Sequence, residues 1–324
     1  MSHAPRTVDY LRISITDRCN ERCLYCMPEG FAGWKERADI LTYEEILRVV
    51  RVATGLGLRK FRVTGGEPLV REGVDGFIAG LAAIPGVESI SLTTNGTRLA
   101  PLARLLRTAG LGSINISLDA LTPSVYRAIT HGDVQPVLEG IHGAIKAGFD
   151  RIKLNAVLIR GMNEQEIWPI LNFAAEHQLP VRFIELMPIS MSEMLNETNF
   201  LPVGEVMRML RERDDLVPLG ELRLGNGPAQ YFRLRKLGVT IGFIGAITNL
   251  HFCENCNKIR LTADGKIRPC LGNHNELDLR AILRSGGSDE DVATLIRNAT
   301  TGKPPEHLFR QNYQPQRIMT AIGG

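Results

Sequence analysis

Short apolar stretches alternate with longer segments of helical periodicity over residues 10–187. One helix start is marked by a capping box, because Thr42 is followed three residues later by Glu45. Such alternation of strands and helices predicts βαβ units and a parallel sheet. The predicted strands are residues 10–16, 60–64, 88–93, 112–119, 151–158 and 181–186, and the predicted helices include 72–83, a run that ends at Gly110, 134–147 and 164–176.

Six strand–helix units are fewer than the eight of a closed TIM barrel, so we expect an α/β fold with an open, partial (β/α)6 barrel. After residue 187 the alternation stops. A helix at 201–213, hairpin strands at 231–234 and 239–244, and helices at 277–284 and 289–299 are predicted there. We therefore expect two parts, a partial barrel at residues 1–190 and a smaller α+β region at residues 191–324 that closes it.

The predicted strands alternate apolar and polar residues, whereas buried parallel strands usually read as continuous apolar runs. If the apolar faces meet the helices, the polar faces line the barrel interior. Four strands place a cation on that face, namely Arg12, Arg62, Lys153 and Arg182. Burying these cations together without anions is prohibitive, so the pattern predicts a wet cavity for a large, multiply anionic ligand. The alternative is a solvated face of an ordinary antiparallel sheet.

Composition sets limits on the class of protein. The 324 residues are 44% hydrophobic and 23% charged, ordinary values for a globular chain that can bury a sizeable core. A net charge of +3 is too small to argue for nucleic acid or a membrane surface. The N-terminus has no apolar signal region, and no apolar run approaches the ~20 residues of a membrane span, so a cytoplasmic protein is expected.

All six cysteines fall into two groups of three, which in a reducing compartment indicates metal or cluster ligation. Cys19, Cys23 and Cys26 lie within eight residues, and three thiols cannot all pair as disulfides. Structural zinc sites usually have four protein ligands, and no nearby Cys or His completes this set. Three thiolates instead suggest an iron–sulfur cluster with one iron left open. A short zinc loop is the alternative.

This cysteine spacing, with Tyr25 just before Cys26, resembles the signature of the radical S-adenosylmethionine (radical SAM) enzymes. In that family the amino and carboxylate groups of SAM chelate the fourth iron, and reduction splits SAM into methionine and a 5′-deoxyadenosyl radical. The sequence Gly65-Gly66-Glu67 after the second strand is similar to the family's GGE motif, which holds the SAM amino group. By this resemblance the SAM contacts are Tyr25, Gly66, Glu67, Ser117, Asn155 and Met187.

Cys253, Cys256 and Cys270 form the second group, and their spacing alone leaves zinc open, with His251 or His274 as a fourth ligand. Three motifs carry a closer resemblance: RISITDRCN at residues 12–20, CNKIRLTADGK at residues 256–266, and the closing Gly323-Gly324. Together they resemble the family of molybdenum cofactor biosynthesis protein A, the GTP 3′,8-cyclases. The resemblance covers residues 9–324.

The resemblance implies a radical SAM enzyme with two [4Fe–4S] clusters, one on each cysteine group, and with SAM as the second cofactor. It implies that the deoxyadenosyl radical removes hydrogen from C3′ of GTP and that the carbon radical then attacks guanine C8. Reduction gives (8S)-3′,8-cyclo-7,8-dihydroguanosine 5′-triphosphate, the first step of molybdenum cofactor biosynthesis. The open iron of the second cluster is expected to meet the guanine.

Several residues resemble the family's GTP contacts, and a triphosphate with about four negative charges would neutralise the interior cations. These residues are Arg12, Arg62, Thr93, Lys153, Arg182, Lys258 and Arg260. Lys258 stands where arginine is expected in several relatives, and lysine lacks the bidentate fork. In the family the terminal glycine pair reaches the active site beside arginines, so Arg12, Arg260, Arg268, Gly323 and Gly324 are the catalytic candidates. A frayed chain end is the alternative for the glycines.

The expected partners are GTP, a reductant protein or small reductant, and the next pathway enzyme, cyclic pyranopterin monophosphate synthase. A homodimer is left open, and neither nucleic acid nor a membrane is expected. Two other functions compete with this interpretation. A radical SAM peptide or protein maturase with an auxiliary cluster usually has more C-terminal cysteines than the three found here. A zinc or cluster module on nucleic acid needs exposed basic stripes with aromatics, but only 6% of the residues are aromatic.

Overall fold

The structure is a computed structural model that describes residues 6–192, 194–220, 222, 224–254, 256–311 and 313–323. Its strands are β1 (Tyr10–Ser14), β2 (Lys60–Thr64), β3 (Ser89–Thr94), β4 (Ser113–Ser117), β5 (Ile152–Leu158), β6 (Val181–Glu185), β7 (Leu216–Pro218), β8 (Gln230–Leu234), β9 (Val239–Ile244), β10 (Lys258–Leu261), β11 (Lys266–Arg268) and β12 (Leu277–Asp278). Its α-helices are α1 (Tyr43–Gly55), α2 (Val74–Ala82), α3 (Leu99–Thr108), α4 (Pro123–Thr130), α5 (Val134–Lys146), α6 (Ile167–Glu176), α7 (Val203–Arg211), α8 (Leu279–Arg284), α9 (Asp289–Thr301) and α10 (Met319–Ile322). Within the described ranges, no helix combines the length and the apolar character needed to cross a membrane.

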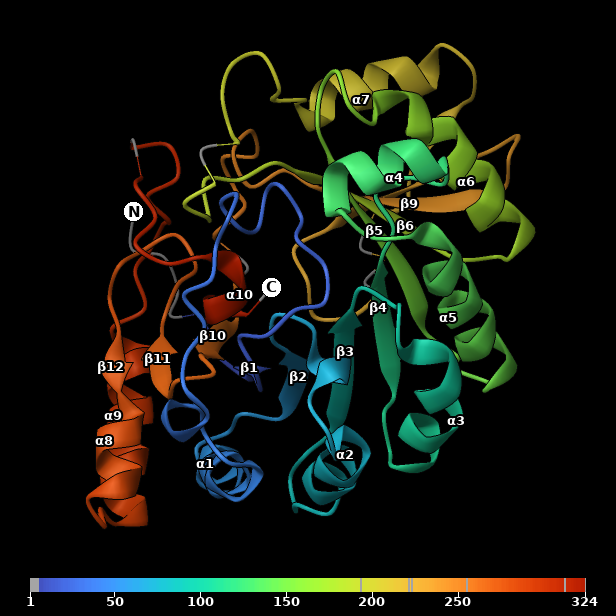
Figure 1. Ribbon diagram of the computed structural model, residues 1–324. Coiled ribbons are helices and arrows are strands. Elements are labelled where there is room, and N and C mark those ends of the chain that lie inside the picture. The colour runs from blue at the N-terminus through green and yellow to red at the C-terminus, as the bar shows by residue number, and fades with distance from the viewer. Residues whose placement is uncertain are drawn as a thin grey trace.

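The described strands form one 12-stranded sheet in the order β12-β11-β10-β1-β2-β3-β4-β5-β6-β9-β8-β7. The eight strands from β10 to β9 run parallel, and antiparallel strands extend the sheet at both ends. Figure 1 shows helices α1 to α6 along one side of the curved sheet, with α8 and α9 near β11 and β12. No strand pairing between described residues joins the two ends, so the predicted open, partial barrel is confirmed.

The C-terminal region adds strands to both edges of this sheet. β9 pairs with β6, and β10 pairs with β1, both in parallel. The sequence pattern therefore gave too few parallel strands, because β9 and β10 do not follow the strand–helix alternation that marks the other six. The division of the chain near residue 190 stays a prediction.

Most of the predicted elements are present, with shifted ends. The strand at residues 60–64 is confirmed at both ends, and the capping box is present, since Glu45 N donates to Thr42 Oγ1 at 3.2 Å and Thr42 N to Glu45 Oε2 at 2.7 Å. The predicted helix at 277–284 is wrong at its start, because Asp278 is an N-cap that accepts from Ala281 N and leaves β12 extended before it. Helix α4 was not predicted, since its eight residues give few periodic positions.

The apolar faces of the strands build the core, as the alternation predicts. Ile13, Phe61 and Leu92 on neighbouring strands are fully buried, together with Val49 of α1 and Ile78 of α2. Burying these side chains against the helices leaves the polar faces of the same strands directed to the interior of the barrel.

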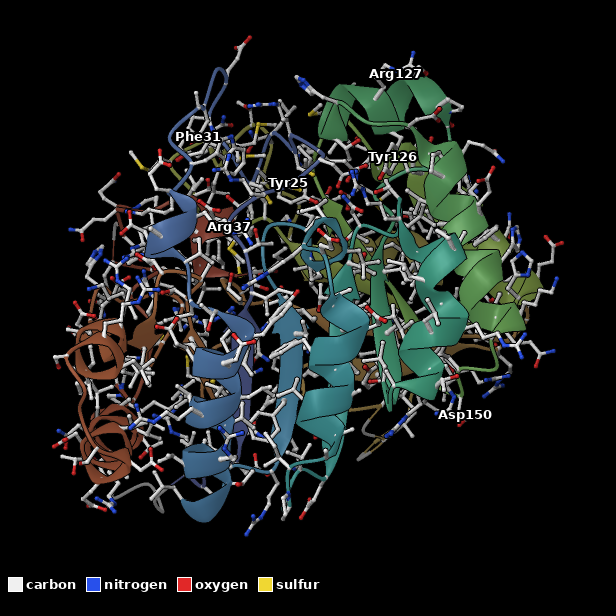
Figure 2. All side chains as sticks on the ribbon, turned by 60° about the horizontal axis from the view of Figure 1, so that its bottom comes forward. Tyr25, Phe31, Arg37, Tyr126, Arg127 and Asp150 are labelled. Atoms are coloured by element: carbon white, nitrogen blue, oxygen red, sulfur yellow. The ribbon has the colours of Figure 1, made fainter. Side chains whose placement is uncertain are left out.

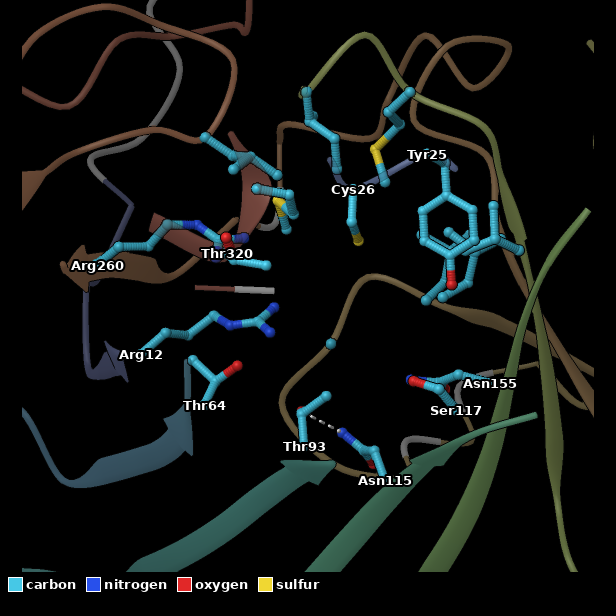
Figure 3. A pocket seen from close by; sticks show the side chains of 18 of the residues that line it. Arg12, Tyr25, Cys26, Thr64, Thr93, Asn115, Ser117, Asn155, Arg260 and Thr320 are labelled. Atoms are coloured by element: carbon cyan, nitrogen blue, oxygen red, sulfur yellow. Dashed lines mark hydrogen bonds between the residues drawn. The ribbon is translucent and has the colours of Figure 1, made fainter. Parts of the chain in front are cut away.

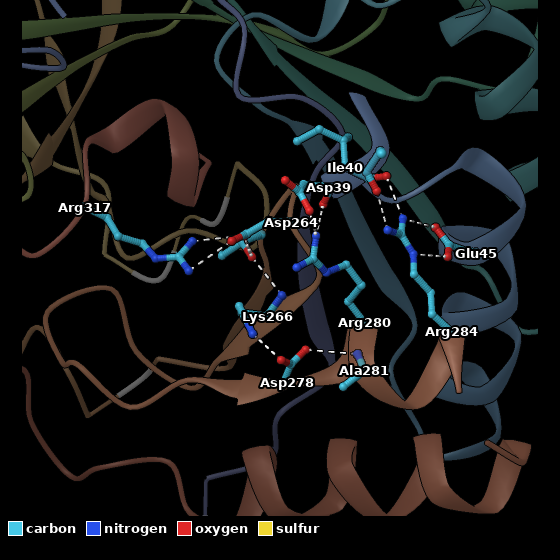
Figure 4. A network of polar contacts seen from close by, with 12 residues as sticks. Asp39, Ile40, Glu45, Asp264, Lys266, Asp278, Arg280, Ala281, Arg284 and Arg317 are labelled. Atoms are coloured by element: carbon cyan, nitrogen blue, oxygen red, sulfur yellow. Dashed lines mark hydrogen bonds and ion pairs between the residues drawn. The ribbon is translucent and has the colours of Figure 1, made fainter. Parts of the chain in front are cut away.

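A polar network connects helix α8 to α1 and to the segment before it (Figure 4). Arg284 Nε donates to Glu45 Oε1 at 2.9 Å, and Arg280 Nη1 donates to Asp39 Oδ1 at 2.7 Å. Nearer the carboxyl end of the chain, Arg317 forms a bidentate pair with Asp264 at 2.9 and 3.1 Å. These contacts join α8 and the turn between β10 and β11 to distant parts of the sequence.

Glycine lets helix α5 pack closely against α3 and the residues just before it, and this contact provides a test of the fold. A Cβ on Gly140 of α5 would lie 2.3 Å from Gly96 O, whereas a Cβ on Gly76 of α2 would meet nothing within 4 Å. We expect Gly140→Ala to destabilise the protein by about 1–3 kcal/mol through overpacking. The matched variant Gly76→Ala should stabilise it by about 0.5–1 kcal/mol through helix propensity.

Thermal unfolding of the anaerobic holoprotein measures both changes. Equal shifts in the two variants would show that the close packing of α5 on Gly96 does not contribute.

Candidate active site

A cavity of about 310 Å³ opens at the carboxyl ends of the parallel strands, where active sites of barrel enzymes lie. Figure 2 places Tyr25 and Tyr126 at this end of the sheet and Asp150, which precedes β5, at the other end. Both cysteine groups lie in the cavity wall, although they are far apart in sequence. The wall also contains these predicted residues: Arg12, Tyr25, Arg62, Gly66, Glu67, Thr93, Ser117, Asn155, Arg182, Met187, Lys258 and Arg260.

The glycines after β2 hold the first cysteine loop in place. Gly66 N donates to Thr16 O at 2.8 Å, and Glu67 N donates to Arg18 O at 2.8 Å. A Cβ on Gly66 would lie 2.2 Å from Arg18 O, so only glycine permits this approach. The glycine pair therefore fixes the backbone immediately before Cys19.

The first three thiols are partly buried, in a setting that fits a cluster. A hydrogen bond with Cys26 and burial raise the pKa of Cys23, and burial raises the pKa of Cys19, to which the backbone N–H of Glu21 donates. Buried thiolates need positive charge nearby, which iron supplies. No group of three His, Cys, Asp or Glu among the described residues has the arrangement of a single-ion site.

The second thiol group differs in its charge environment. Burial raises the pKa of Cys253 and of Cys270. At Cys256 the charges of Lys258 and Lys303 outweigh burial, and the pKa is lowered. Cys256 is therefore the member of this group whose surroundings favour the thiolate before any iron is considered.

The two histidines that left zinc open lie elsewhere. His251 Nδ1 is 2.6 Å from Glu254 Oε1, and the His251 side chain is 76% exposed. The ring of His274 stacks on Tyr313 with centroids 4.7 Å apart. Neither histidine is among the residues that line the cavity.

Three arginines stand side by side on one wall of the cavity. Strand pairing aligns Arg260 of β10 with Arg12 of β1, and Arg12 with Arg62 of β2. Aligned residues on neighbouring strands are about 5 Å apart and point to the same face. Burial and then repulsion from Arg260 lower the pKa of Arg12, and burial lowers the pKa of Arg260 to about 10. Figure 3 shows Arg12 and Arg260 extending together into the cavity near Thr64 and Thr320.

Tyr10 lies among these cations and was not identified from the sequence. Arg62 Nε donates to its hydroxyl oxygen, and Lys258 Nζ lies 5.8 Å from its ring centroid. Burial raises the pKa of Tyr10, but Arg62, Arg12 and Lys258 outweigh it and lower the pKa to about 8. Burial also lowers the pKa of Lys258 to about 8. The surrounding positive charge thus lowers the pKa of Tyr10, whereas burial is the main cause of the lowered pKa of Lys258.

Lys153 and Arg182 extend the basic wall to β5 and β6. Burial, with repulsion from Arg182, Arg62 and Arg151, lowers the pKa of Lys153 to about 7. Burial lowers the pKa of Arg182 to about 10, and Arg182 Nε donates to Asn155 Oδ1 at 2.9 Å. Lys153 does not itself line the cavity, because it lies two residues before Asn155, nearer the amino end of β5.

Glu67 also lines the cavity, and most of its acceptor capacity is used within the protein. Its Oε1 accepts from Leu69 N at 2.9 Å and from Thr94 Oγ1 at 2.7 Å, and its Oε2 accepts from Asn95 N at 2.7 Å. These are three of about four acceptor positions of a carboxylate. Burial raises the pKa of Glu67 to about 7. The carboxyl group thus orders the end of β3 and retains little capacity for an amine.

Two further buried carboxyl groups support the cysteine loop. Tyr25 donates its hydroxyl to Asp119 Oδ2 at 2.6 Å, and Tyr126 donates its hydroxyl to Glu21 Oε1 at 2.7 Å. Burial raises the pKa of Asp119 to about 6 and that of Glu21 to about 7. Together with Glu67 and Glu185, these groups bring four carboxyl side chains into the cavity lining, here called the acidic wall.

The remaining cofactor candidates gather on the acidic side. Ser117 of β4 and Asn155 of β5 are paired in register, and Met187 follows β6. Figure 3 shows Ser117 and Asn155 close together, with the Tyr25 side chain on the same side of the cavity. On β3, Thr93 Oγ1 accepts from Arg62 Nη1 at 3.1 Å and so links this side to the basic wall.

Arg268 and Gly323, two of the catalytic candidates, are not among the residues that line the cavity. Arg268 does not line the cavity, and its Nη1 donates to Glu276 Oε1 at 2.7 Å. Gly323 packs against the end of β1, where its carbonyl accepts from Arg260 and a Cβ would lie 2.9 Å from Ser14 Cβ. Its φ of 92° also favours glycine. Gly324 lies outside the described residues.

Comparison with known proteins identifies the family. The model of the radical SAM superfamily matches residues 13–174, and the model described as Molybdenum Cofactor Synthesis C matches residues 179–309. A GTP 3′,8-cyclase of Moorella thermoacetica is 46% identical over 320 residues, and one of Pelotomaculum thermopropionicum is 44% identical over 322. Each alignment covers 98% of both chains. The chain belongs to the GTP 3′,8-cyclase family.

Solved radical SAM structures share the fold of this GTP 3′,8-cyclase family member. SuiB of Streptococcus suis, solved with its precursor peptide SuiA, has a TM-score of 0.64 over 90% of this chain and 67% of SuiB. SuiB bound to S-adenosylmethionine has a TM-score of 0.62 over 90% of this chain and 68% of SuiB. Both are 14% identical to the chain, so the likeness concerns the fold alone. Together with the family models, it confirms the α/β partial barrel of the radical SAM type.

As in the rest of the GTP 3′,8-cyclase family, this chain carries two [4Fe–4S] clusters and uses SAM. Among the residues of the site that sequence reasoning did not find are Tyr10, Lys303 and His307. Tyr10 shares the period-two face of Arg12, so its position could have been read from the strand pattern. Lys303 and His307 follow α9 in an irregular segment, and no local pattern shows that this segment folds back onto the second cysteine group.

The close contact at Gly66 gives a test of the first cysteine loop. We expect Gly66→Ala to displace Arg18 and the following Cys19, so that the protein keeps about half of its iron, that of the second cluster. Gly55→Ala is the matched control, since a Cβ at Gly55 of α1 would meet nothing within 4 Å. Iron and acid-labile sulfide, measured after anaerobic reconstitution, should be normal in the control. Full iron content in Gly66→Ala would contradict the assigned role of the glycine.

Proposed function

We propose that the chain converts GTP to (8S)-3′,8-cyclo-7,8-dihydroguanosine 5′-triphosphate in molybdenum cofactor biosynthesis. One observation carries the proposal beyond family membership. A single cavity is lined by two groups of three cysteines, by a row of aligned arginines and by four carboxyl side chains. This arrangement suits one cationic and one polyanionic ligand bound side by side.

The acidic wall is suited to SAM, whose amino group and sulfonium are positive. Gly66 would offer its backbone carbonyl and Glu67 its remaining acceptor position to the amino group. Ser117, Asn155 and Met187 would contact the carboxylate, ribose or adenine, with the Tyr25 backbone beside the adenine. The cluster on Cys19, Cys23 and Cys26, with SAM bound, supplies the radical that removes the C3′ hydrogen of GTP.

The basic wall is suited to the triphosphate of GTP. Arg12, Arg62 and Arg260 can donate several hydrogen bonds each to phosphate oxygens, in pairs that match the planar fork. Lys258, Arg182 and Thr93 would complete these contacts. Lys153, nearer the amino end of β5, would add its positive charge without lining the cavity. The second cysteine group lies at the same end and would place its open iron at the guanine.

Gly323 would keep Arg260 in place near the end of β1. The Gly323 carbonyl accepts from Arg260, and no side chain fits between it and Ser14. Arg268 is better suited to holding the loop around Glu276 than to touching substrate.

The wider setting follows from the chemistry of the proposed reaction. Ring closure after hydrogen removal consumes one electron and one proton, so a reductant protein or small reductant is required. The product is the substrate of cyclic pyranopterin monophosphate synthase. Six thiolates that must stay reduced favour the cytoplasm. We propose that residues 1–190 form the barrel and that residues 191–324 form the region that closes it. A homodimer is left open.

A peptide maturase is the second candidate, because SuiB shares the fold. The aligned arginines argue against it, since a peptide chain does not bring the concentrated negative charge that three neighbouring guanidinium groups require.

Product analysis tests the proposed function. Anaerobic protein with SAM, dithionite and GTP should form a compound of the same mass as GTP but different retention, because one hydrogen atom leaves and one electron and one proton return. GTP carrying deuterium at C3′ should transfer it to 5′-deoxyadenosine. ATP in place of GTP is the control. Release of unlabelled 5′-deoxyadenosine regardless of nucleotide would support a maturase instead.

The lowered pKa of Lys153 predicts a proton linkage. With a pKa of about 7 in the free protein, Lys153 is half charged at pH 7, and a nearby triphosphate should raise that pKa. GTP binding should then take up about half a proton more in the wild type than in Lys153→Met. Affinity should rise as the pH falls from 9 to 7, and Lys153→Met should weaken it roughly tenfold.

Anaerobic calorimetry at pH 7 in two buffers of different ionisation enthalpy measures this uptake. Lys146→Met, at the end of α5, is the control for loss of a lysine. Identical proton uptake in the wild type and Lys153→Met would remove Lys153 from the GTP contacts.

A further inference from the structure

The segment after α9, residues 303–308, reaches all three parts of the second cysteine group. Lys303 Nζ donates to Lys258 O at 2.8 Å and to Pro269 O at 2.8 Å, next to Cys270. The same ammonium donates to the Cys256 side chain. One side chain thus joins the backbone on both sides of the cluster ligands.

The rest of the segment makes matching contacts. The His307 backbone N–H donates to the Cys253 side chain, and Leu308 N donates to Gly272 O at 2.8 Å. His307 Nε2 lies 2.8 Å from Ala246 O, which fixes its ring. Arg6 Nη1 and Nη2 donate to Cys253 O and Pro304 O, both at 2.6 Å, and so anchor the segment to the cysteine loop.

Lys303 lines the cavity, but it has no donor left for a substrate. An ammonium group carries three N–H donors. Two are used by the carbonyls of Lys258 and Pro269, and the third is used by Cys256. The group is therefore a fixed positive charge directed at a cluster ligand, unlike Arg12 and Arg260, which extend into the cavity.

A fixed charge in this place acts on the cluster. The reduction potential of an iron–sulfur cluster depends on net charge and on hydrogen bonds to its sulfurs. Reduction adds a negative charge, so a nearby ammonium and an N–H···S bond stabilise the reduced form over the oxidised one. Groups around the ligands also orient them.

We propose that Lys303 is a positioning residue of the second cluster, which clamps the Cys256 and Cys270 segments together and raises the reduction potential of that cluster. The proposal rests on the second cluster of the proposed function, but not on GTP as its substrate. The contacts of this lysine are to the backbone beside the cysteines and not of the kind expected for a GTP ligand.

Potentiometric titration of the anaerobic holoenzyme, followed by electron paramagnetic resonance, tests the proposal. Dithionite supplies the electron, and a Cys19→Ala variant shows which of the two reduction waves belongs to the second cluster. In Lys303→Met the potential of that wave should become more negative by at least about 59 mV. For a one-electron couple this corresponds to a tenfold change in the ratio of reduced to oxidised cluster. The wave of the first cluster should not move. Lys303→Arg, which keeps the charge, should return the potential of the second cluster most of the way to the wild-type value.

Lys236→Met, on the exposed side of the hairpin near Arg213, is the matched control and should move neither wave. Loss of the second cluster in Lys303→Met with recovery in Lys303→Arg also supports the clamp. An unchanged potential in Lys303→Met, equal shifts in the Met and Arg variants, or loss of the cluster in both would overturn the proposal. These readouts need neither GTP nor SAM, so they stay valid if GTP turnover fails.

Discussion

The alignment of Arg260, Arg12 and Arg62 across three neighbouring parallel strands is the constraint on which the rest of the site depends. At spacings near 5 Å, each neighbouring pair repels by roughly 3 kcal/mol at an effective dielectric constant of 20. Burial adds to this cost, as the lowered pKa values of Arg12 and Arg260 indicate. A fold that maintains such a row needs an anion with several charges, and a triphosphate meets that need. The hydrophobic core on the other face of the same strands keeps the row in register.

The two cysteine groups reach the row of arginines by different means. Gly66 brings the first cysteine loop against the end of β2, where only a residue without a side chain fits. The second cysteine group arrives on β10, which pairs with β1 and so inserts Arg260 into the row. The second cysteine group and the row of arginines are thus connected through the same strand, β10. A change that shifts β10 should therefore disturb both at once, which separate binding modules would not show.

Much of this could be predicted from local pattern. Period-two alternation identified the polar face and its cations, and cysteine spacing identified both ligand groups. The positions of Arg268 and Lys303 could not be predicted, because each depends on a long-range partner. Arg268 shares the register of Arg260 but is diverted to Glu276, and Lys303 is directed to Cys256 by the return of the chain after α9. Likewise, Glu67 fits its motif, yet its carboxylate mainly orders the end of β3.

The most direct test of the central claim is the thermal stability of the anaerobic holoprotein with GTP, guanosine or inorganic triphosphate. If the arginine row requires a polyanion, GTP at 100 times its Kd should stabilise the fold by about 2.7 kcal/mol. Inorganic triphosphate should reproduce part of the effect and guanosine little of it. In Arg12→Gln the difference between GTP and guanosine should shrink. Equal stabilisation by guanosine and GTP in the wild type would contradict the account, because the binding energy would then come from the base and ribose and not from the aligned arginines.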